Sequence, residues 1–209
     1  MVGQGVLREC LLDADADAVL LIVRAQTGLH DPKLRELVHK DFLDFSGVES
    51  ELSGYDACFF CLGVSSAGMK EADYRRVTYD ITVAAARVLA RLNPAMTFIY
   101  VSGLGTDSSE QGRTMWARVK GKTENDLLRL PFKAAYMFRP GGIVPMHGVK
   151  SKTPFYQALL TVFGPVMPLL YRLFPQYVTT TERVGRAMLK AAKVGAPKAI
   201  LETADINKL

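Results

Sequence analysis

A few residues near the N-terminus have the types and spacing to bind a phosphate-bearing ligand. Gly3 and Gly5 stand at the beginning of residues 2–12, which have helical periodicity. Glycines at such a point let the backbone approach a phosphate, and the helix N-terminus favours its negative charge. Arg24 follows the apolar run 18–23, with no acidic residue beside it. Its planar fork of donors suits a 2′-phosphate, so Arg24 favours NADP(H) over NAD; a solvated arginine at a strand end is the alternative.

Other residues that could do chemistry are better explained by the fold. Cys58 and Cys61 have CxxC spacing, but residues three apart on a strand point to opposite faces, so we expect both in the core. The histidines have no metal-ligand spacing, and we predict no metal site. His147 could line a substrate pocket, because it follows a turn at Pro140. No Gly-x-Ser-x-Gly elbow occurs, which argues against an α/β hydrolase.

The elements that must position these residues alternate along the chain. The expected strands are residues 18–23, 55–61, 97–101, 134–138 and, more weakly, 199–201. The expected helices are residues 2–12, a short helix opened by Asp31-Pro32, and residues 71–92, 114–130 and 180–192. Continuous β-branched and aromatic runs suit a parallel sheet covered on both faces. The sequence therefore predicts an α/β fold, a doubly wound parallel sheet in a single domain over residues 1–209.

The chain runs into the helix at residues 2–12 with no strand before it. In a dinucleotide-binding fold a strand and a glycine-rich turn come first, and the strand order 3-2-1-4-5-6 places that strand at the centre of the sheet. Two central strands would lack a partner without it. We therefore expect roughly ten more residues upstream in the native protein, ending in a glycine-rich turn, with Met1 an internal methionine.

Composition narrows the class of protein. The 209 residues are 49% hydrophobic and 22% charged, enough apolar material for a core, which excludes a disordered or fibrous chain. The net charge of +5 is scattered, with no basic run, so we expect a small-molecule ligand rather than nucleic acid. Three cysteines do not suit a disulfide-stapled secreted module, and neither a signal peptide nor an apolar run of ~18 residues is evident. These features predict a cytoplasmic protein.

Several short motifs occur in a fairly specific order. They are Gly3-Gln4-Gly5-Val6-Leu7-Arg8-Glu9-Cys10, Cys61-Leu62-Gly63, Tyr100-Val101-Ser102, Val119-Lys120-Gly121 and Arg139-Pro140-Gly141-Gly142. Together they resemble the atypical short-chain dehydrogenase/reductase family, in the branch of Tat-interacting-protein-like and NAD-dependent epimerase/dehydratase-like proteins. The resemblance implies a Rossmann sheet that binds NAD(P). It places the cofactor against Gly3, Arg24, Asp41, Phe42, Leu62, Gly63, Lys120, Pro140, Gly141 and Gly142.

The family's hydride chemistry uses Tyr-x-x-x-Lys, in which tyrosine donates the proton and lysine holds the nicotinamide ribose. Here the spacing is kept as Trp116 and Lys120, so tryptophan stands in the tyrosine position, and its indole N–H cannot shuttle a proton at neutral pH. Ser102 matches the serine region, and the next residue is Gly103. The side chains that could replace the acid are Tyr79, Asp80, Ser108 and Ser109.

The apolar segment 155–174, interrupted by glycine and prolines, predicts a substrate lid within residues 144–180, and hence an apolar substrate. A homodimer contact and a peripheral membrane surface are the alternatives. Two functions follow. The first is an NADP(H)-dependent oxidoreductase that acts on a small apolar carbonyl or alcohol, with Ser102 and Lys120 as catalytic residues. The second is a non-catalytic NAD(P)-binding sensor or interaction protein that has lost the tyrosine.

Overall fold

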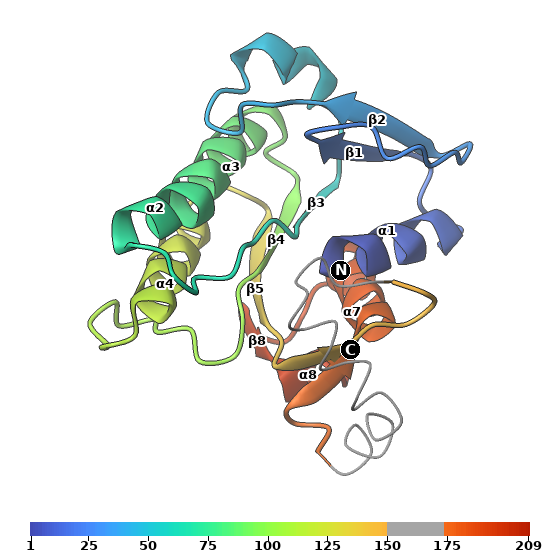
Figure 1. Cartoon of the computed structure of the whole chain (residues 1–209). Coiled ribbons are helices and arrows are strands. Elements are labelled where there is room, and N and C mark those ends of the chain that lie inside the picture. The colour runs from blue at the N-terminus through green and yellow to red at the C-terminus, as the bar shows by residue number, and fades with distance from the viewer. Residues whose placement is uncertain (150–173) are drawn as a thin grey trace.

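The structure is a computed structural model, and it describes residues 1–149 and 174–209. The strands are parallel and lie in three sets, shown in Figure 1. The four-stranded sheet has the order β3 (Ala57–Phe60), β4 (Thr97–Val101), β5 (Ala134–Arg139) and β8 (Ile200–Glu202). A second sheet pairs β1 (Val19–Val23) with β2 (Leu34–Val38), and a third pairs β6 (Gly142–Val144) with β7 (Val178–Thr180). Among the described residues, β1 and β3 each pair along one edge only.

Helices cover both faces of the four-stranded sheet (Figure 1). One face carries α2 (Glu71–Arg75), η2 (Arg76–Asp80), α3 (Ile81–Leu92) and α4 (Met115–Leu128). The other carries α1 (Val2–Leu12) and α7 (Thr181–Val194), with α8 (Thr203–Ile206) after β8. A short 3-10 helix, η1 (Ser46–Glu51), follows β2. This is the α/β architecture that the sequence predicts, with helices on both sides of a parallel sheet.

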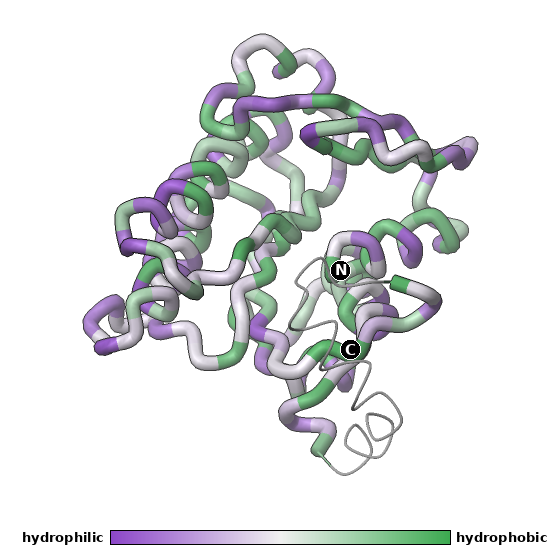
Figure 2. Tube along the Cα trace, in the orientation of Figure 1, coloured by the Kyte–Doolittle hydropathy of each residue, from purple (hydrophilic) through white to green (hydrophobic). Residues whose placement is uncertain are grey.

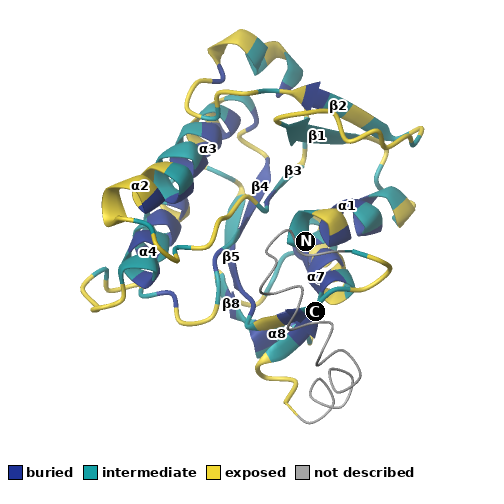
Figure 3. Cartoon of the chain, viewed as in Figure 1, coloured by how far each residue is buried: buried dark blue, intermediate teal, exposed yellow. Residues whose placement is uncertain are grey.

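The core has two halves because alternate residues of a strand face opposite sides of the sheet. Phe98 and Tyr100 of β4 pack in one cluster with α3 and α4, whereas Ile99 packs in the other with α1 and α7. Figure 3 shows that β4 is buried along most of its length, as are parts of α3, α4 and α7, and Figure 2 shows hydrophobic residues in the same central region.

Gly5 and Gly185 allow α1 and α7 to pack closely. A Cβ atom on Gly5 would lie 2.6 Å from the Cβ of Thr181, and one on Gly185 would lie 2.7 Å from the Cγ of Glu9. These contacts fix the beginning of α1 beside α7. They therefore place Gly3 at the carboxyl edge of the sheet, within reach of the end of β3.

The expected short helix after Asp31-Pro32 is wrong, because β2 occupies this region as a strand. The Asp31 side chain accepts a hydrogen bond from the backbone N–H of Lys33, and its carbonyl accepts one from Leu34, which makes a turn into the strand. β2 then pairs with β1 over its whole length, so pairing with a neighbour decides the structure. The expected helix at 71–92 is interrupted by the π-helical turn η2.

Candidate functional site

The residues with the strongest chemical signal meet at the carboxyl ends of β4 and β5. Ser102 follows β4, and Pro140 follows β5. The ammonium group of Lys120, on α4, donates a hydrogen bond to the main-chain carbonyl of Ser102. A Cβ atom on Gly103 would lie 3.9 Å from the Nζ of Lys120 and 4.0 Å from the carbonyl oxygen of Pro140. We call Ser102, Gly103, Lys120 and Pro140 the lysine cluster.

A buried ion pair lies directly behind the lysine cluster. Glu124, one turn after Lys120 on α4, is 0% exposed, and its Oε1 accepts a hydrogen bond of 2.5 Å from the hydroxyl of Ser102. The Nε of Arg139, on β5, donates to Oε1 and Oε2 of Glu124 at 3.0 and 3.2 Å. Burial lowers the pKa of Lys120 to about 8, and the carboxylate of Glu124 acts in the opposite direction.

Trp116 lies on the same face of α4 as Lys120, one turn earlier. Its ring packs beside Gly105 of the loop after β4: a Cβ atom on that glycine would lie 3.5 Å from the Cη2 of the indole. Tryptophan therefore occupies the place where Tyr-x-x-x-Lys would present a phenol. An indole ring offers an apolar surface and one N–H donor there, and it has no acidic hydroxyl.

The glycine-rich beginning of α1 meets the end of β3. A Cβ atom on Gly3 would lie 3.3 Å from the Cβ of Cys61, the residue immediately before Leu62 and Gly63. Leu62 and Gly63 are exposed. The structure thus places Gly3 beside the loop that begins at Leu62 and Gly63. The resemblance implies that these two segments contact the same cofactor.

Arg24 and Asp41 follow the two strands of the second sheet, β1 and β2. Arg24 comes directly after β1 and is exposed. Asp41 follows β2, and its Oδ1 accepts a hydrogen bond of 2.9 Å from the backbone N–H of Leu43, which forms a local turn. Phe42 packs against His39 and Phe45, with ring centroids 5.7 and 5.9 Å apart, so its ring contributes to the core. The described contacts that build the lysine cluster do not extend to these residues.

The turn after β5 is fixed by the C-terminal part of the chain. The backbone N–H of Gly141 donates a 2.8 Å hydrogen bond to the hydroxyl of Thr203 on α8. A Cβ atom on Gly141 would lie 2.4 Å from the carbonyl oxygen of Tyr177, so only glycine fits this close approach. Gly142 begins β6 and is exposed. Pro140 and Gly141 are therefore held beside Leu104, whose backbone N–H donates to the carbonyl of Pro140 at 3.0 Å.

Large apolar side chains are exposed in the loops around this edge of the sheet. They follow β3, β4 and β6 in the chain, and they are Leu62, Val64, Leu104 and Met146. Their exposed fractions lie between 36% and 50%. Exposed apolar side chains around convergent polar groups are typical of a binding site for an organic ligand.

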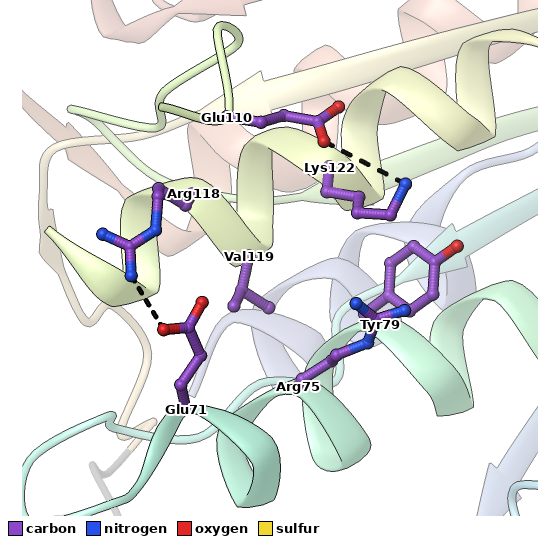
Figure 4. A pocket seen from close by; sticks show the side chains of 7 residues that line it. All are labelled: Glu71, Arg75, Tyr79, Glu110, Arg118, Val119 and Lys122. Carbon is purple, nitrogen blue, oxygen red and sulfur yellow. Dashed lines mark hydrogen bonds and ion pairs between the residues drawn. The ribbon is translucent and has the colours of Figure 1, made fainter. Parts of the chain in front are cut away.

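Two of the side chains that could replace the missing acid lie on the wrong side of α4. Tyr79 and Asp80 belong to η2, and Tyr79 lines a hollow of about 100 Å³. Figure 4 shows Tyr79 between that segment and α4. The Tyr79 hydroxyl donates a 2.6 Å hydrogen bond to Asp126, which raises the pKa of Tyr79. Asp80 pairs with Arg75 at 3.8 Å. Because Lys122 and Asp126 line this side, it is opposite to the Lys120 face.

The two loop serines are also engaged elsewhere. The hydroxyl of Ser108 accepts a 2.6 Å hydrogen bond from Arg139, and the hydroxyl of Ser109 donates one of 2.6 Å to Asp107. None of these four candidate side chains is therefore free to replace the tyrosine of Tyr-x-x-x-Lys. The expected lid segment, residues 155–174, lies almost wholly outside the described residues.

The remaining expectations concern cysteine and histidine. Cys58 and Cys61 are free, and burial raises the pKa of each to about 12, so both are thiols at neutral pH. In the described ranges, no group of three His, Cys, Asp or Glu side chains is arranged to hold a metal ion. The ring of His147 contacts Glu182 at 2.7 Å, at the beginning of α7.

Sequence reasoning missed Glu124 altogether and saw Arg139 only as part of a motif. A signal was present: Glu124 lies four residues after Lys120 and eight after Trp116, on the helix face that turns toward the sheet. A carboxylate at such a position needs a buried cation, and Arg139 at the end of a central strand is the candidate.

Comparisons with known proteins agree with this architecture. No family model matches the chain. The protein FMP52-1, mitochondrial, of Scheffersomyces stipitis is 26% identical over 143 residues, which is 68% of this chain and 62% of that protein. HTATIP2 of Rattus norvegicus is 27% identical over 142 residues, which is 66% of this chain and 57% of that protein. The matched part thus spans less than two thirds of either relative.

Solved structures share the fold at low sequence identity. An oxidoreductase of the short-chain dehydrogenase/reductase family from Burkholderia thailandensis has a TM-score of 0.63 and 16% identity, covering 92% of this chain and 82% of that one. The Bordetella bronchiseptica enzyme WbmF, solved in complex with NAD⁺, has a TM-score of 0.62 and 14% identity, covering 99% and 73%.

The parallel sheet, its flanking helices and these structural neighbours define a Rossmann-type α/β protein. The chain shares this fold with enzymes of the short-chain dehydrogenase/reductase family, and it is similar in sequence to HTATIP2, as the resemblance to Tat-interacting-protein-like proteins implies. The predicted fold class is thereby confirmed.

The expectation of a cytoplasmic protein is wrong, because several relatives carry names that place them in the mitochondrion. The expectation rested on cysteine usage and on the lack of a secretory signal, which do not separate the cytosol from a mitochondrial location. None of the helices within the described ranges has the length and hydropathy needed to cross a lipid bilayer.

Proposed function

We propose that this chain binds NADP(H) at the carboxyl edge of its sheet and acts as an oxidoreductase on a small apolar carbonyl or alcohol. The observation that carries the proposal is the lysine cluster, in which Lys120 lies at the end of β4 beside Gly103 and Pro140. In open α/β sheets, ligands bind outside the carboxyl ends of the strands. The ammonium group of Lys120 is placed to donate to ribose hydroxyls, as the corresponding lysine does in the family that the chain resembles.

Three further observations support the ligand class. Gly3 at the beginning of α1 suits a pyrophosphate, because helix N-termini stabilise anions. Exposed Arg24 after β1 suits a 2′-phosphate better than a hydroxyl, which favours NADP(H) over NAD. The apolar side chains of Leu62 and Leu104 favour a substrate with little charge. The names of the relatives point to a mitochondrial location for this activity.

The cofactor would supply or accept the hydride. Lys120 would hold the nicotinamide ribose and orient the ring, and the exposed side chains of Leu62 and Leu104 would contact the substrate. A carbonyl that receives a hydride also needs a proton on its oxygen. Trp116 cannot donate that proton at neutral pH. The substrate oxygen would therefore take its proton from solvent, which predicts slow turnover.

Trp116 also favours the second function, an NAD(P)-binding sensor without turnover. Titration of the chain with NADPH and NADH by calorimetry, followed by assay against a panel of apolar aldehydes and ketones, separates the two. Tight NADPH binding with measurable turnover supports the enzyme, and binding without turnover supports the sensor. Binding of neither nucleotide would overturn both.

A further inference from the structure

Glu124 is an unusual residue for the inner face of a helix. Its side chain is completely buried, yet both carboxylate oxygens have partners. A buried carboxylate is destabilising unless a cation and hydrogen-bond donors compensate it, and Arg139 and Ser102 meet this need.

The Glu124–Arg139 pair links the segments that surround Lys120. Through Ser102 it contacts the end of β4, and Arg139 brings in β5. The guanidinium group of Arg139 also donates to Ser108 at 2.6 Å, in the loop after β4, and to Glu202 at 3.3 Å, on β8. The ammonium group of Lys120 donates a hydrogen bond to the main-chain carbonyl of the same Ser102. Lys120 and the Glu124–Arg139 ion pair are therefore both hydrogen-bonded to Ser102.

The buried carboxylate of Glu124 lies one turn from Lys120 on α4, and its negative charge opposes the effect of burial on the lysine. The charged groups in the network are the carboxylates of Glu124 and Glu202 and the guanidinium of Arg139. Glu202 is 39% exposed, so solvent screens its charge, and Glu124 is the carboxylate of this network that acts on Lys120. Tyr100 of β4 also faces this network, and burial raises its pKa, so it carries no charge at neutral pH.

We propose that Glu124 is a positioning residue: fixed by Arg139 and Ser102, it supplies the buried negative charge that keeps Lys120 an ammonium ion directed at the carboxyl edge of the sheet. This inference rests on the proposed function at one point only, namely that Lys120 binds the nucleotide. An ammonium group offers three donors to ribose hydroxyls and attracts an anionic dinucleotide, whereas a neutral amine does neither as well.

The test measures the charge state of Lys120 without any nucleotide. The chain is labelled with ¹³C at lysine Cε, the Lys120 resonance is assigned from its loss in Lys120→Arg, and NMR spectra are recorded from about pH 6 to about pH 11. In the wild-type chain we expect a pKa of about 8. In Glu124→Gln, which keeps the shape and loses the charge, we expect the pKa to fall by about 1 or more.

Glu202→Gln is the matched control, since Glu202 contacts the same guanidinium but is 39% exposed and has no contact with Ser102 among those described. We expect it to change the pKa of Lys120 much less than Glu124→Gln does, because solvent screens an exposed carboxylate. If Glu124 only stabilised the fold, Glu124→Gln would change the pKa of Lys120 in the opposite direction. Water would enter the loosened site, and the pKa of Lys120 would rise toward about 10.4. An unchanged or raised pKa in Glu124→Gln overturns the proposal.

Arg139→Gln is the second variant, in case Glu124→Gln does not fold. The guanidinium group of Arg139 is a cation in the same network as Lys120, so its removal should raise the pKa of Lys120. An unchanged or lowered pKa would count against the proposal. Because these titrations need no nucleotide, they can fail independently of the proposed function. Calorimetry of NADPH binding to Lys120→Ala tests the latter alone.

Discussion

Lys120 and Ser102 are joined by a hydrogen bond from the ammonium group of the lysine to the main-chain carbonyl of the serine. Ser102 is itself fixed to the neighbouring strand, since its backbone N–H donates to the carbonyl of Phe138 at 2.9 Å. The lysine is thus held against the end of the central strands rather than extended into solvent. We propose that this lysine binds the nicotinamide ribose, as the family resemblance implies, and Trp116 lacks the acidic hydroxyl of the tyrosine in Tyr-x-x-x-Lys.

The first prediction restores that acid. Trp116→Tyr should place a phenol one turn before Lys120 and raise NADPH-dependent reduction of an apolar aldehyde by about 100-fold or more, because a positioned general acid contributes on this scale. The measurement is the initial rate of NADPH oxidation. Trp116→Phe is the control, since it keeps the ring and supplies no hydroxyl. Equal rates for the two variants would show that this position does not face the reacting carbonyl.

The second prediction concerns the choice between the two nucleotides. Arg24→Ala should weaken NADPH binding about tenfold or more and leave NADH binding unchanged, because a charge-assisted bond to the 2′-phosphate is lost. Calorimetric titration of both nucleotides provides the comparison. Arg91→Ala is the control, since Arg91 is an exposed arginine that pairs with Glu49. If Arg24→Ala weakened NADH binding by the same factor, Arg24 would instead contact a chemical group that NADH and NADPH share.

The third prediction follows from the lowered pKa of Lys120. In the unfolded chain lysine titrates near its ordinary pKa of about 10.4, so between about pH 8 and that value the unfolded state binds more protons than the folded state. The free energy of unfolding should therefore rise with pH in this window. Urea unfolding of the wild-type chain and Lys120→Met at several pH values tests the effect: the wild type should gain stability relative to the variant. A constant difference would mean that the pKa of Lys120 is not lowered.

The fourth prediction tests the loop that leads from β4 to α4. A Cβ atom on Gly121 would lie 1.7 Å from the carbonyl oxygen of Asp107, so the backbone of the loop crosses α4 at this glycine. Gly121→Ala should lower the free energy of unfolding by about 2 kcal/mol or more, because the loop must move. Gly47→Ala is the control, since nothing lies within 4 Å of the corresponding Cβ position. Equal stability of the two variants would contradict the described packing.

The strands and the long helices could be predicted because their apolar periodicity is strong. The run at residues 97–101 is β4 with the same bounds, and residues 2–12 are α1. The segment after Asp31-Pro32 was harder, because capping signals favour a helix while pairing with β1 makes a strand. The local sequence does not indicate that this segment pairs with another strand, because strand formation depends on the neighbouring strand as well as on propensity.

The candidate site was predicted in part. Ser102, Lys120 and Pro140 come together because parallel strands end at one edge, which a sequence pattern can anticipate. The role of Glu124 could not be read in the same way, since it depends on Arg139, fifteen positions away on another element. The location of Tyr79 on the opposite side of α4 likewise depends on how η2 packs.

Calorimetric titration of NADPH into the wild-type chain, Lys120→Ala and Lys122→Ala tests the central claim most directly. Both lysines lie on α4, but Lys122 faces the hollow beside Tyr79 and pairs with Asp126 at 3.1 Å. We predict that Lys120→Ala weakens NADPH binding about tenfold or more, and that Lys122→Ala binds as the wild type does. Equal affinity of Lys120→Ala and the wild-type chain would contradict the assignment of the site.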